Sequence, residues 1–333
     1  MRRLTALAVL ALGLSFASAQ AADKNKTWTD PAQAAREDGD FKLQGEYTGN
    51  VGPNGGKVGA QVIALGNGQF RLVLYKGGLP GHGWDGKDKM SAEGRLEGSV
   101  VRFTQGNETL TLSGGQIRSS EDATGALKRI DRTSPTLGQK PPAGAVILFD
   151  GTKDALEKNW KKGARMTKDG LLEQGATSLP TFTNHHLHIE FRLPYKPGAR
   201  GQGRGNSGIY VQGRHEIQML DSFGLEGKHN ECGGVYSVSD PAVNMCLPPL
   251  AWQTYDIEYT PARFGPDGKK AANARMTVRH NGVVVHDNLE IPKSHTTAAP
   301  NRADEKAPGP VYLQNHGNPV RYRNIWVVQK KSS

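Results

Sequence analysis

The residues with the clearest chemical potential stand in one stretch, 205–222, which reads GNSGIYVQGRHEIQMLDS. Glu216 and Gln218 are two positions apart, and in a strand such residues project from the same face. Ile217 and Met219 then share the opposite, apolar face. The polar face is a candidate binding surface if it lines a cleft. It is the ordinary solvent side of a half-buried strand if it does not, and the alternation alone leaves both interpretations open.

Short antiparallel strands must position this stretch, because the surrounding sequence has the periodicity of strands. Residues 187–193 and 254–259 alternate apolar and polar side chains, and 275–287 form a hairpin pattern that turns at Asn281 and Gly282. No long helical pattern interrupts them. We therefore predict a two-sheet sandwich of antiparallel strands rather than an α/β fold.

Two long loops, 194–207 and 226–251, flank the stretch. Loops of this length in a compact β domain are usually functional or disordered. A group of histidines, His185, His186 and His188, precedes the first loop and could suggest a metal site. We interpret His186 and His188 instead as a solvated strand face, because apolar residues alternate with them.

The chain divides into two β regions. The first has short strands separated by glycine and a strong hairpin signal at Gly66, Asn67 and Gly68. A segment rich in Pro and Gly follows it and marks a linker. The predicted organisation is a signal peptide over 1–22, a small N-terminal antiparallel β module over 23–132, a linker over 133–145 and a second β domain over 146–330.

The N-terminus has the three regions of a secretory signal peptide. Arg2 and Arg3 precede an apolar run over residues 4–14, and small residues follow up to Ala19 and Ala22, where cleavage is expected. The apolar run is short for a membrane span, so we predict no transmembrane segment. The protein is expected to be exported to the periplasm or the extracellular space; an uncleaved tether is the alternative.

The chain has 333 residues, a formal charge of +10 and 36% hydrophobic residues, which suffice for a folded core. Loss of the signal peptide lowers the charge to +8. The basic residues are scattered and are not interleaved with aromatic residues in the way that single-strand binders require. We therefore predict no nucleic-acid partner.

The only two cysteines are Cys232 and Cys246. In an exported protein an even pair that closes a short loop predicts a disulfide. Such a bond would contribute on the order of 3 kcal/mol to stability. A free thiol near the candidate site is the alternative.

Five motifs occur in order along the second region: VILFDGT at 146–152 with Trp160 after it, LHIEFRLP at 187–194, GNSGIY through Asp221 and Ser222, WQTYDI at 252–257, and NHGNPVRYRNIW at 315–326. Together they resemble the 3-keto-disaccharide hydrolase family, over about residues 146–328. The resemblance implies an all-β fold, a concanavalin-like jelly-roll β-sandwich. The first region is similar to a small antiparallel β module that precedes this domain in some exported bacterial members.

The resemblance implies an enzyme that acts on sugars already oxidised to a ketone at C3. A C3 carbonyl acidifies the C2 proton, so abstraction of that proton can expel the group on C1, and water can then add. This chemistry needs a base near C2, a stabiliser for the enolate and a proton donor for the leaving oxygen. A sugar C3 oxidase is implied as the pathway partner.

The resemblance also suggests roles for individual residues. Glu216 is the first choice for the base or for a metal ligand. His316 could be the second acid/base group or a ligand, although a histidine between glycine-rich turns could equally just hydrogen-bond its turn. No cofactor is certain; a divalent metal ion held by Glu216 and His316 would polarise the C3 carbonyl. Asp221 faces away from Glu216 in a regular strand and would need a bulge to join it.

Four residues are candidates for substrate binding. Arg204 and Asn206 stand where the chain enters the central stretch and could hold sugar hydroxyls or the enolate oxygen. Gln218 shares the face of Glu216. Trp252 could supply a surface on which a sugar ring stacks.

Two other functions remain open from the sequence. A jelly roll can be a carbohydrate-binding module without catalysis, in which Glu216 only accepts hydrogen bonds from hydroxyls. A laminarinase-type glycosidase is the other alternative, and it requires two carboxylates about 5 to 5.5 Å apart. Gln218 and the short side chain of Asp221 argue against that pair.

Overall fold

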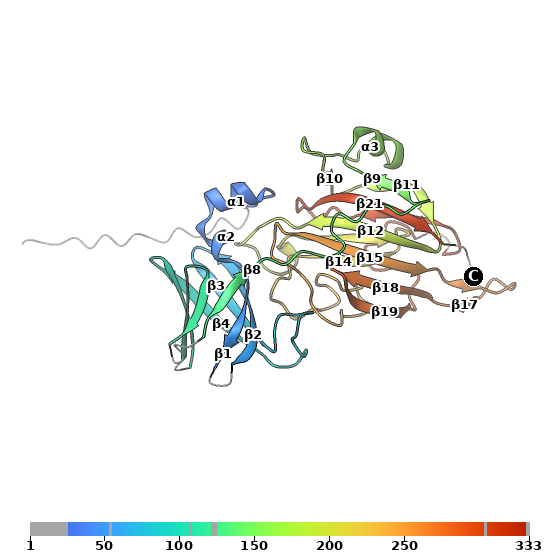
Figure 1. The fold of residues 1–333 in the computed structure, drawn as a ribbon. Helices are drawn as coiled ribbons and strands as arrows, with labels where there is room; N and C mark the ends of the chain where they lie inside the picture. The colour runs from blue at the N-terminus through green and yellow to red at the C-terminus, as the bar shows by residue number, and fades with distance from the viewer. Residues whose placement is uncertain (1–25, 53–54, 107, 121–124, 303–304, 331–333) are drawn as a thin grey trace, which may run out of the picture.

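The computed structural model describes residues 26–52, 55–106, 108–120, 125–302 and 305–330. The fold is all-β, as the sequence predicts, and consists of an N-terminal barrel followed by a two-sheet sandwich (Figure 1). Among these residues, no helix is both long and apolar enough to cross a membrane. The predicted signal peptide, 1–22, lies outside the described residues.

Antiparallel strands close into the barrel in the order of the sequence, β1 to β8. Their bounds are β1 Gly45–Val51, β2 Gly56–Gly66, β3 Gln69–Lys76, β4 Lys89–Glu97, β5 Val100–Gln105, β6 Glu108–Ser113, β7 Gln116–Ser119 and β8 Leu127–Ile130. The predicted hairpin joins β2 to β3, where Asn67 and Gly68 have φ of 56° and 66°. Asparagine and glycine are the residues that adopt this left-handed backbone most readily.

Two short helices, α1 (Pro31–Glu37) and α2 (Gly39–Leu43), precede the barrel. The Gly68 N–H of the β2–β3 turn donates to Asp40 Oδ2 of α2 at 2.8 Å. This contact places α2 at the end of the barrel that carries the turn. The barrel interior is filled by buried apolar side chains such as Phe70 and Phe103.

The sandwich has a larger sheet in the order β10-β21-β12-β15-β18-β19, with β9 beside β21, and a smaller sheet in the order β11-β20-β13-β14. Its elements are β9 Val146–Phe149, α3 Lys153–Asn159, β10 Leu172–Glu173, β11 Thr177–Phe182, β12 His185–Arg192, η1 Gly201–Gly203, β13 Ser207–Val211, β14 His215–Met219, β15 Trp252–Thr260, β16 Arg263–Phe264, β17 Lys270–Ala272, β18 Ala274–His280, β19 Val283–Ile291, β20 Gly309–Leu313 and β21 Arg321–Gln329. Strands β16 and β17 form a separate ribbon.

The inner faces of the two sheets form one apolar core. Ile217 and Met219 of β14 are fully buried in the same cluster as Ile189 and Phe191 of β12. His215 also faces the core, where its ring lies 5.7 Å from that of Tyr259. Burial lowers the pKa of His215 to about 3, so this histidine packs as a neutral ring.

The segment 133–145 lies along the outer face of the larger sheet, and the green chain after β8 crosses this sheet in Figure 1. Thr136 Oγ1 donates to Asp256 Oδ2 at 2.8 Å, and the Gly138 N–H donates to Glu190 Oε1 at 2.6 Å. These bonds tie the segment to β15 and β12. The predicted linker is therefore a packed strap.

The environment of His188, before the first long loop, differs from the one predicted from the sequence. His188 is fully buried, its ring stacks on Trp326 at 4.9 Å, and its Nδ1 lies 2.7 Å from Asp256 Oδ1. The expected solvated face is wrong for His188, because the strap and Trp326 cover this part of the sheet. A sequence pattern cannot show that a linker folds back over a polar strand face.

Arg204 joins the two domains. Its Nε donates to Asp221 Oδ2 at 2.6 Å, and both terminal nitrogens lie 3.2 Å from the carbonyl oxygen of Ala64 in barrel strand β2. Arg204 is 5% exposed and Asp221 is 3% exposed. The buried ion pair therefore anchors the sandwich to the barrel.

The predicted disulfide is not formed. Cys232 and Cys246 are free and buried, and the Cys232 sulfur lies 3.2 Å from the Tyr255 hydroxyl oxygen. Both side chains lie in the apolar core of the sandwich, where the Cys232 and Cys246 thiols contact each other as reduced groups. The two cysteines here serve as small core side chains.

Replacement of Arg204 tests the anchor. We expect Arg204→Ala to lower the free energy of unfolding by about 3 to 5 kcal/mol, because it leaves Asp221 buried without its cation. Urea denaturation measures the change. Arg71→Ala, which removes a solvent-exposed pair with Glu93, is the control and should cost at most about 1 kcal/mol. Equal losses in the two variants would contradict the anchor.

Candidate active site

The polar face of β14 is buried although it faces away from the core. Glu216 is 2% exposed and Gln218 is 1% exposed. The Glu216 N–H donates to Thr296 Oγ1 at 3.1 Å, and the Gln218 N–H donates to the carbonyl of Gly234 at 2.9 Å. Segments from two distant loops therefore cover the free edge of β14. The burial of Glu216 and Gln218 shows that their face is not the solvated side of an ordinary strand.

Glu216 is held by a short chain of hydrogen bonds. The hairpin of β13 and β14 pairs Tyr210 with Glu216, and the Tyr210 hydroxyl donates to Glu216 Oε2 at 2.6 Å. Gln314, just after β20, donates from Nε2 to the same hydroxyl at 3.0 Å. The ring of Tyr210 also lies 5.4 Å from that of Tyr312. Three neighbouring strands therefore orient one carboxyl group.

A glycine makes room for this carboxyl group. A Cβ atom at Gly208 of β13 would lie 2.3 Å from Glu216 Oε1. No real contact between such atoms is that short, so any side chain at Gly208 would displace Glu216. The glycine lets the carboxyl group lie against the strand backbone.

Burial changes the acidity of Glu216. Loss of hydration raises the pKa of Glu216 from its ordinary 4.5 to about 7, although the hydrogen bond from Tyr210 acts in the opposite direction. Burial and the neighbouring Glu216 raise the pKa of Tyr210, which keeps the phenol as a donor. A carboxyl group with a pKa near 7 can both accept and return a proton at neutral pH.

A cluster of amide side chains lies beside Glu216. Asn206 donates from Nδ2 to Gln202 Oε1 at 3.0 Å, and Gln218 donates from Nε2 to the same oxygen at 3.2 Å. Gln202 Nε2 in turn donates to the carbonyl of Asn230 at 2.8 Å. Asn206 Oδ1 is buried and has no hydrogen-bond partner within the described structure. That oxygen can accept a hydrogen bond from a ligand hydroxyl.

The loop after β14 brings further polar groups to the same side. The Tyr236 N–H donates to the carbonyl of Glu216 at 3.0 Å, which continues the smaller sheet beyond β14. The rings of His229 and Tyr236 meet edge to face at 5.9 Å. His229 and residues 237–240 line a hollow of about 530 Å³. An imidazole therefore lies on the loop whose Tyr236 N–H bonds the Glu216 carbonyl.

Several residues expected at the site lie elsewhere. Arg204 and Asp221 bind each other at the barrel interface. The ring of Trp252 lies 4.0 Å from the Arg323 guanidinium on the outer face of the larger sheet. The core of the sandwich separates that face from Glu216, so the structure does not bring Trp252 to Glu216.

His316 is exposed in the turn after Gln314, where its carbonyl accepts a hydrogen bond from Asn318 Nδ2 at 3.2 Å. Across the described ranges, no group of three or more His, Cys, Asp or Glu side chains could hold a metal ion. The donor set around Glu216 consists of a phenol and amides. No described contact joins Glu216 to His316, and a metal site of these two residues stays a prediction.

Sequence reasoning missed three parts of the site. The hydrogen bond from Tyr210 to Glu216 follows from strand pairing, which the sequence does not specify. Gln314 follows β20, about a hundred residues after Tyr210. His229 stands in a loop without periodicity. The period-two spacing of Tyr210 and Gly208 was the one available signal, because both must share a strand face.

Comparisons with known proteins agree with this fold. Residues 144–328 match the family described as "3-keto-alpha-glucoside-1,2-lyase-like domain". A crystal structure from Parabacteroides distasonis at 2.13 Å, named "putative glycosyl hydrolase", is 30% identical, with a TM-score of 0.50 over 57% of this chain and 85% of that chain. A second structure from that organism, at 1.70 Å and with the same name, is 17% identical, with a TM-score of 0.41 over 56% and 94% of the two chains. No curated protein matches the sequence.

The raised pKa of Glu216 predicts a stability that depends on pH. The folded state binds this proton more tightly than the unfolded chain, so the contribution of Glu216 is full below pH 4.5 and is lost as the pH rises through 7. Glu216→Gln stays neutral. We expect the variant to gain about 3 kcal/mol of unfolding free energy relative to wild type between pH 4.5 and pH 8.

Urea denaturation at a series of pH values measures this difference. Tyr210→Phe should move the pH window upward, because it removes the hydrogen bond that lowers the pKa of Glu216. Thr104→Ala, on the exposed surface of the barrel, controls for pH trends of the method. Parallel curves for wild type and Glu216→Gln would show that the pKa of Glu216 is not raised.

Proposed function

The chain belongs to the family of 3-keto-alpha-glucoside-1,2-lyase-like domains, and from this we propose that it cleaves glycosidic bonds in sugars that carry a ketone at C3. The family and the similar glycosyl hydrolase structure support a glycosidase-type enzyme. The observation that carries the finer proposal is a single buried carboxyl group, Glu216, with a pKa of about 7.

The chemistry requires a base that removes the C2 proton and later returns a proton to C2. The C3 ketone makes the C2 proton acidic, and its removal produces an enolate. The electron pair of the enolate then forms the C1–C2 double bond as the C1–O bond breaks, and the aglycone leaves with a proton. Addition of water to C1 and return of a proton to C2 complete the hydrolysis. A reaction that stops before the addition of water is a lyase.

Glu216 is our choice for the group that takes the C2 proton. Its Oε2 accepts from Tyr210, which leaves Oε1 for the substrate. Burial makes the ionised carboxylate more basic than an ordinary glutamate, and transfer to a proton acceptor with a pKa near the working pH is efficient. Tyr210 and Gln314 position this carboxylate.

Other groups complete the proposal. Asn206 Oδ1 and Gln314 Oε1 are buried and have no partner within the described residues, so both can accept hydrogen bonds from sugar hydroxyls. His229 and His316 are the two candidates to protonate the leaving oxygen. We assign no step to a metal ion. Because Glu216 is 2% exposed, the segments that cover it must move to admit a sugar.

The arrangement favours this reaction over the two alternatives. A retaining glycosidase of the laminarinase type needs a second carboxylate at about 5 to 5.5 Å, and the nearest acidic residue along the strand, Asp221, is bound to Arg204. A binding module has no need for a desolvated carboxyl group, which destabilises the folded protein above neutral pH. The proposal extends to export of the protein and to an enzyme that oxidises sugars at C3 upstream of it.

Turnover tests the function. We expect the purified protein to release the aglycone from a 3-keto-disaccharide and not from its unoxidised parent. Glu216→Gln should lower kcat/KM by about 10² to 10⁴, because it removes the base. The wild-type kcat/KM should rise with pH around an apparent pKa of about 7, at which the base ionises.

The same assay separates the alternatives. Release from the unoxidised parent would indicate an ordinary glycosidase, and sugar binding without release would indicate a binding module. Loss of activity with a chelator, restored by a divalent ion, would contradict the absence of a metal step. His229→Ala and His316→Ala identify the proton donor, since a good leaving group such as a nitrophenol should rescue only the relevant variant.

Gly208 provides a separate test of the geometry. Gly208→Ala should lower kcat/KM by about tenfold or more, because the new Cβ displaces the Glu216 carboxyl group. Gly203→Ala, in the adjacent loop and with no atom within 4 Å of its new Cβ, is the matched control and should keep wild-type activity. Full activity in Gly208→Ala would remove Glu216 from the proposed role. Circular dichroism confirms that both variants are folded.

A further inference from the structure

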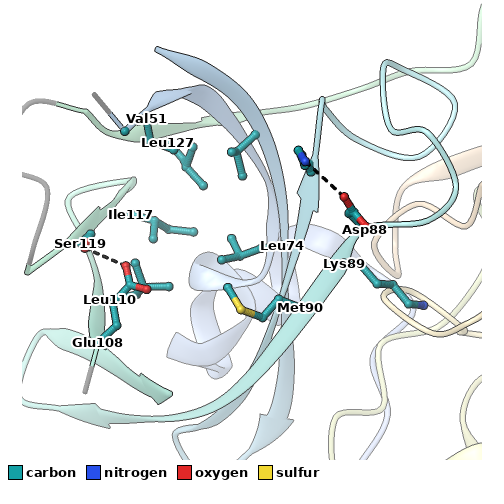
Figure 2. Close-up of a pocket in the computed structure, with 13 residues that line it drawn as sticks. Val51, Leu74, Asp88, Lys89, Met90, Glu108, Leu110, Ile117, Ser119 and Leu127 are labelled. Atoms are coloured by element: carbon teal, nitrogen blue, oxygen red, sulfur yellow. Dashed lines mark hydrogen bonds and ion pairs between the residues drawn. The ribbon is translucent and has the colours of Figure 1, made fainter. Parts of the chain in front are cut away.

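The barrel contains a second hollow, far along the chain from the candidate active site. Its volume is about 630 Å³, and Figure 2 shows the side chains around it. The apolar residues that line it are Val51, Val58, Leu74, Met90, Leu110, Ile117 and Leu127. All its lining residues belong to the barrel, so the hollow is a site of its own.

The hollow follows from how the barrel is closed. Helix α2 and the β2–β3 turn close one end, where Asp40 holds Gly68. Val58 near the start of β2 and Leu74 near the end of β3 lie toward the opposite end. Phe70 and Phe103 fill the interior, whereas the side chains at the second end do not meet across it. Barrels of this size can hold one small ligand in their mouth.

The lining is unusually apolar for a surface hollow. Met90 is 41% exposed, and Leu74 and Leu110 are partly exposed inward-facing residues of the barrel core. Each Å² of apolar surface that a ligand removes from water contributes about 25 cal/mol. A volume of this size suits a ligand of ordinary small-molecule dimensions. The occupant therefore has an apolar body.

The described residues at the mouth of the hollow form two ion pairs and add one further carboxylate. Lys76 Nζ lies 3.3 Å from Asp88 Oδ2, and Lys89 pairs with Glu226 of the sandwich. Glu108 accepts a hydrogen bond from the Ser119 hydroxyl at 2.8 Å. Among the described lining residues, both lysines are paired to carboxylates, and Glu108 adds a negative charge that disfavours an anionic head group. The polar groups of the mouth can still hydrogen-bond an uncharged head.

We propose that the barrel binds a neutral amphiphile, with an alkyl or aryl tail in the hollow and an uncharged hydroxylated head at the mouth. The proposal does not depend on the activity proposed for the sandwich. The aliphatic side chains bind the tail by removing it from water. The paired lysines and the Glu108 carboxylate discriminate against fatty acids, because an anionic head would have to displace an existing ion pair and lie near a carboxylate.

Fluorescence titration with N-phenyl-1-naphthylamine, a neutral apolar dye, tests the site. We expect saturable enhancement at a one-to-one ratio, with competition by 1-decanol at least about tenfold stronger than by decanoate. Leu110→Trp fills the hollow and should weaken dye binding by about tenfold or more. Thr104→Trp places the same side chain on the exposed barrel surface and should leave binding unchanged.

Met90→Gln provides a second variant, since an exposed side chain at the mouth can change without unfolding the barrel. It should weaken dye binding less than Leu110→Trp. Unsaturable binding, or binding that Leu110→Trp and Met90→Gln leave unchanged, would overturn the site. Stronger competition by decanoate would overturn the neutral head group.

Discussion

The apolar contact between the inner faces of the two sheets is the constraint on which the rest of the sandwich depends. Because side chains alternate along a strand, burial of Ile217 and Met219 forces Glu216 and Gln218 to the other side. A shift of one residue in the register of the strand would move each of its side chains to the opposite face of the sheet. The same pairing sets Tyr210 opposite Glu216. The chemistry of the site is therefore a consequence of core packing.

Burial then changes the chemical properties of the polar face of β14. A carboxylate on an open strand keeps its water and an ordinary acidity, whereas the Glu216 side chain is buried against Tyr210 and Gly208. No described cation compensates for the loss of water, and the pKa rises. The contrast with Asp221 is direct, since that carboxylate is equally buried but lies against Arg204. Similar burial thus accompanies a raised pKa at one carboxyl group and an ion pair at the other.

The barrel and the strap determine how polar groups outside the site are used. Ala64 of the barrel accepts from Arg204, and the strap covers His188, Glu190 and Asp256 on the larger sheet. Polar side chains that could bind a metal ion or a substrate are therefore already hydrogen-bonded within the protein. Asn206 Oδ1 and Gln314 Oε1 are among the described buried acceptors that remain able to bind a ligand.

The sequence by itself determined the all-β class, the hairpin at Asn67 and Gly68, and the shared face of Glu216 and Gln218. These depend on local backbone preference and on a spacing of two residues, which neighbouring residues carry. Only the tertiary structure decided that Glu216 is buried, that Tyr210 and Gln314 hold it, that Arg204 and Trp252 lie elsewhere, and that Cys232 and Cys246 are free thiols. Those outcomes depend on which distant segments meet, and desolvation and hydrogen bonding act between atoms that are close in space and far apart in the chain.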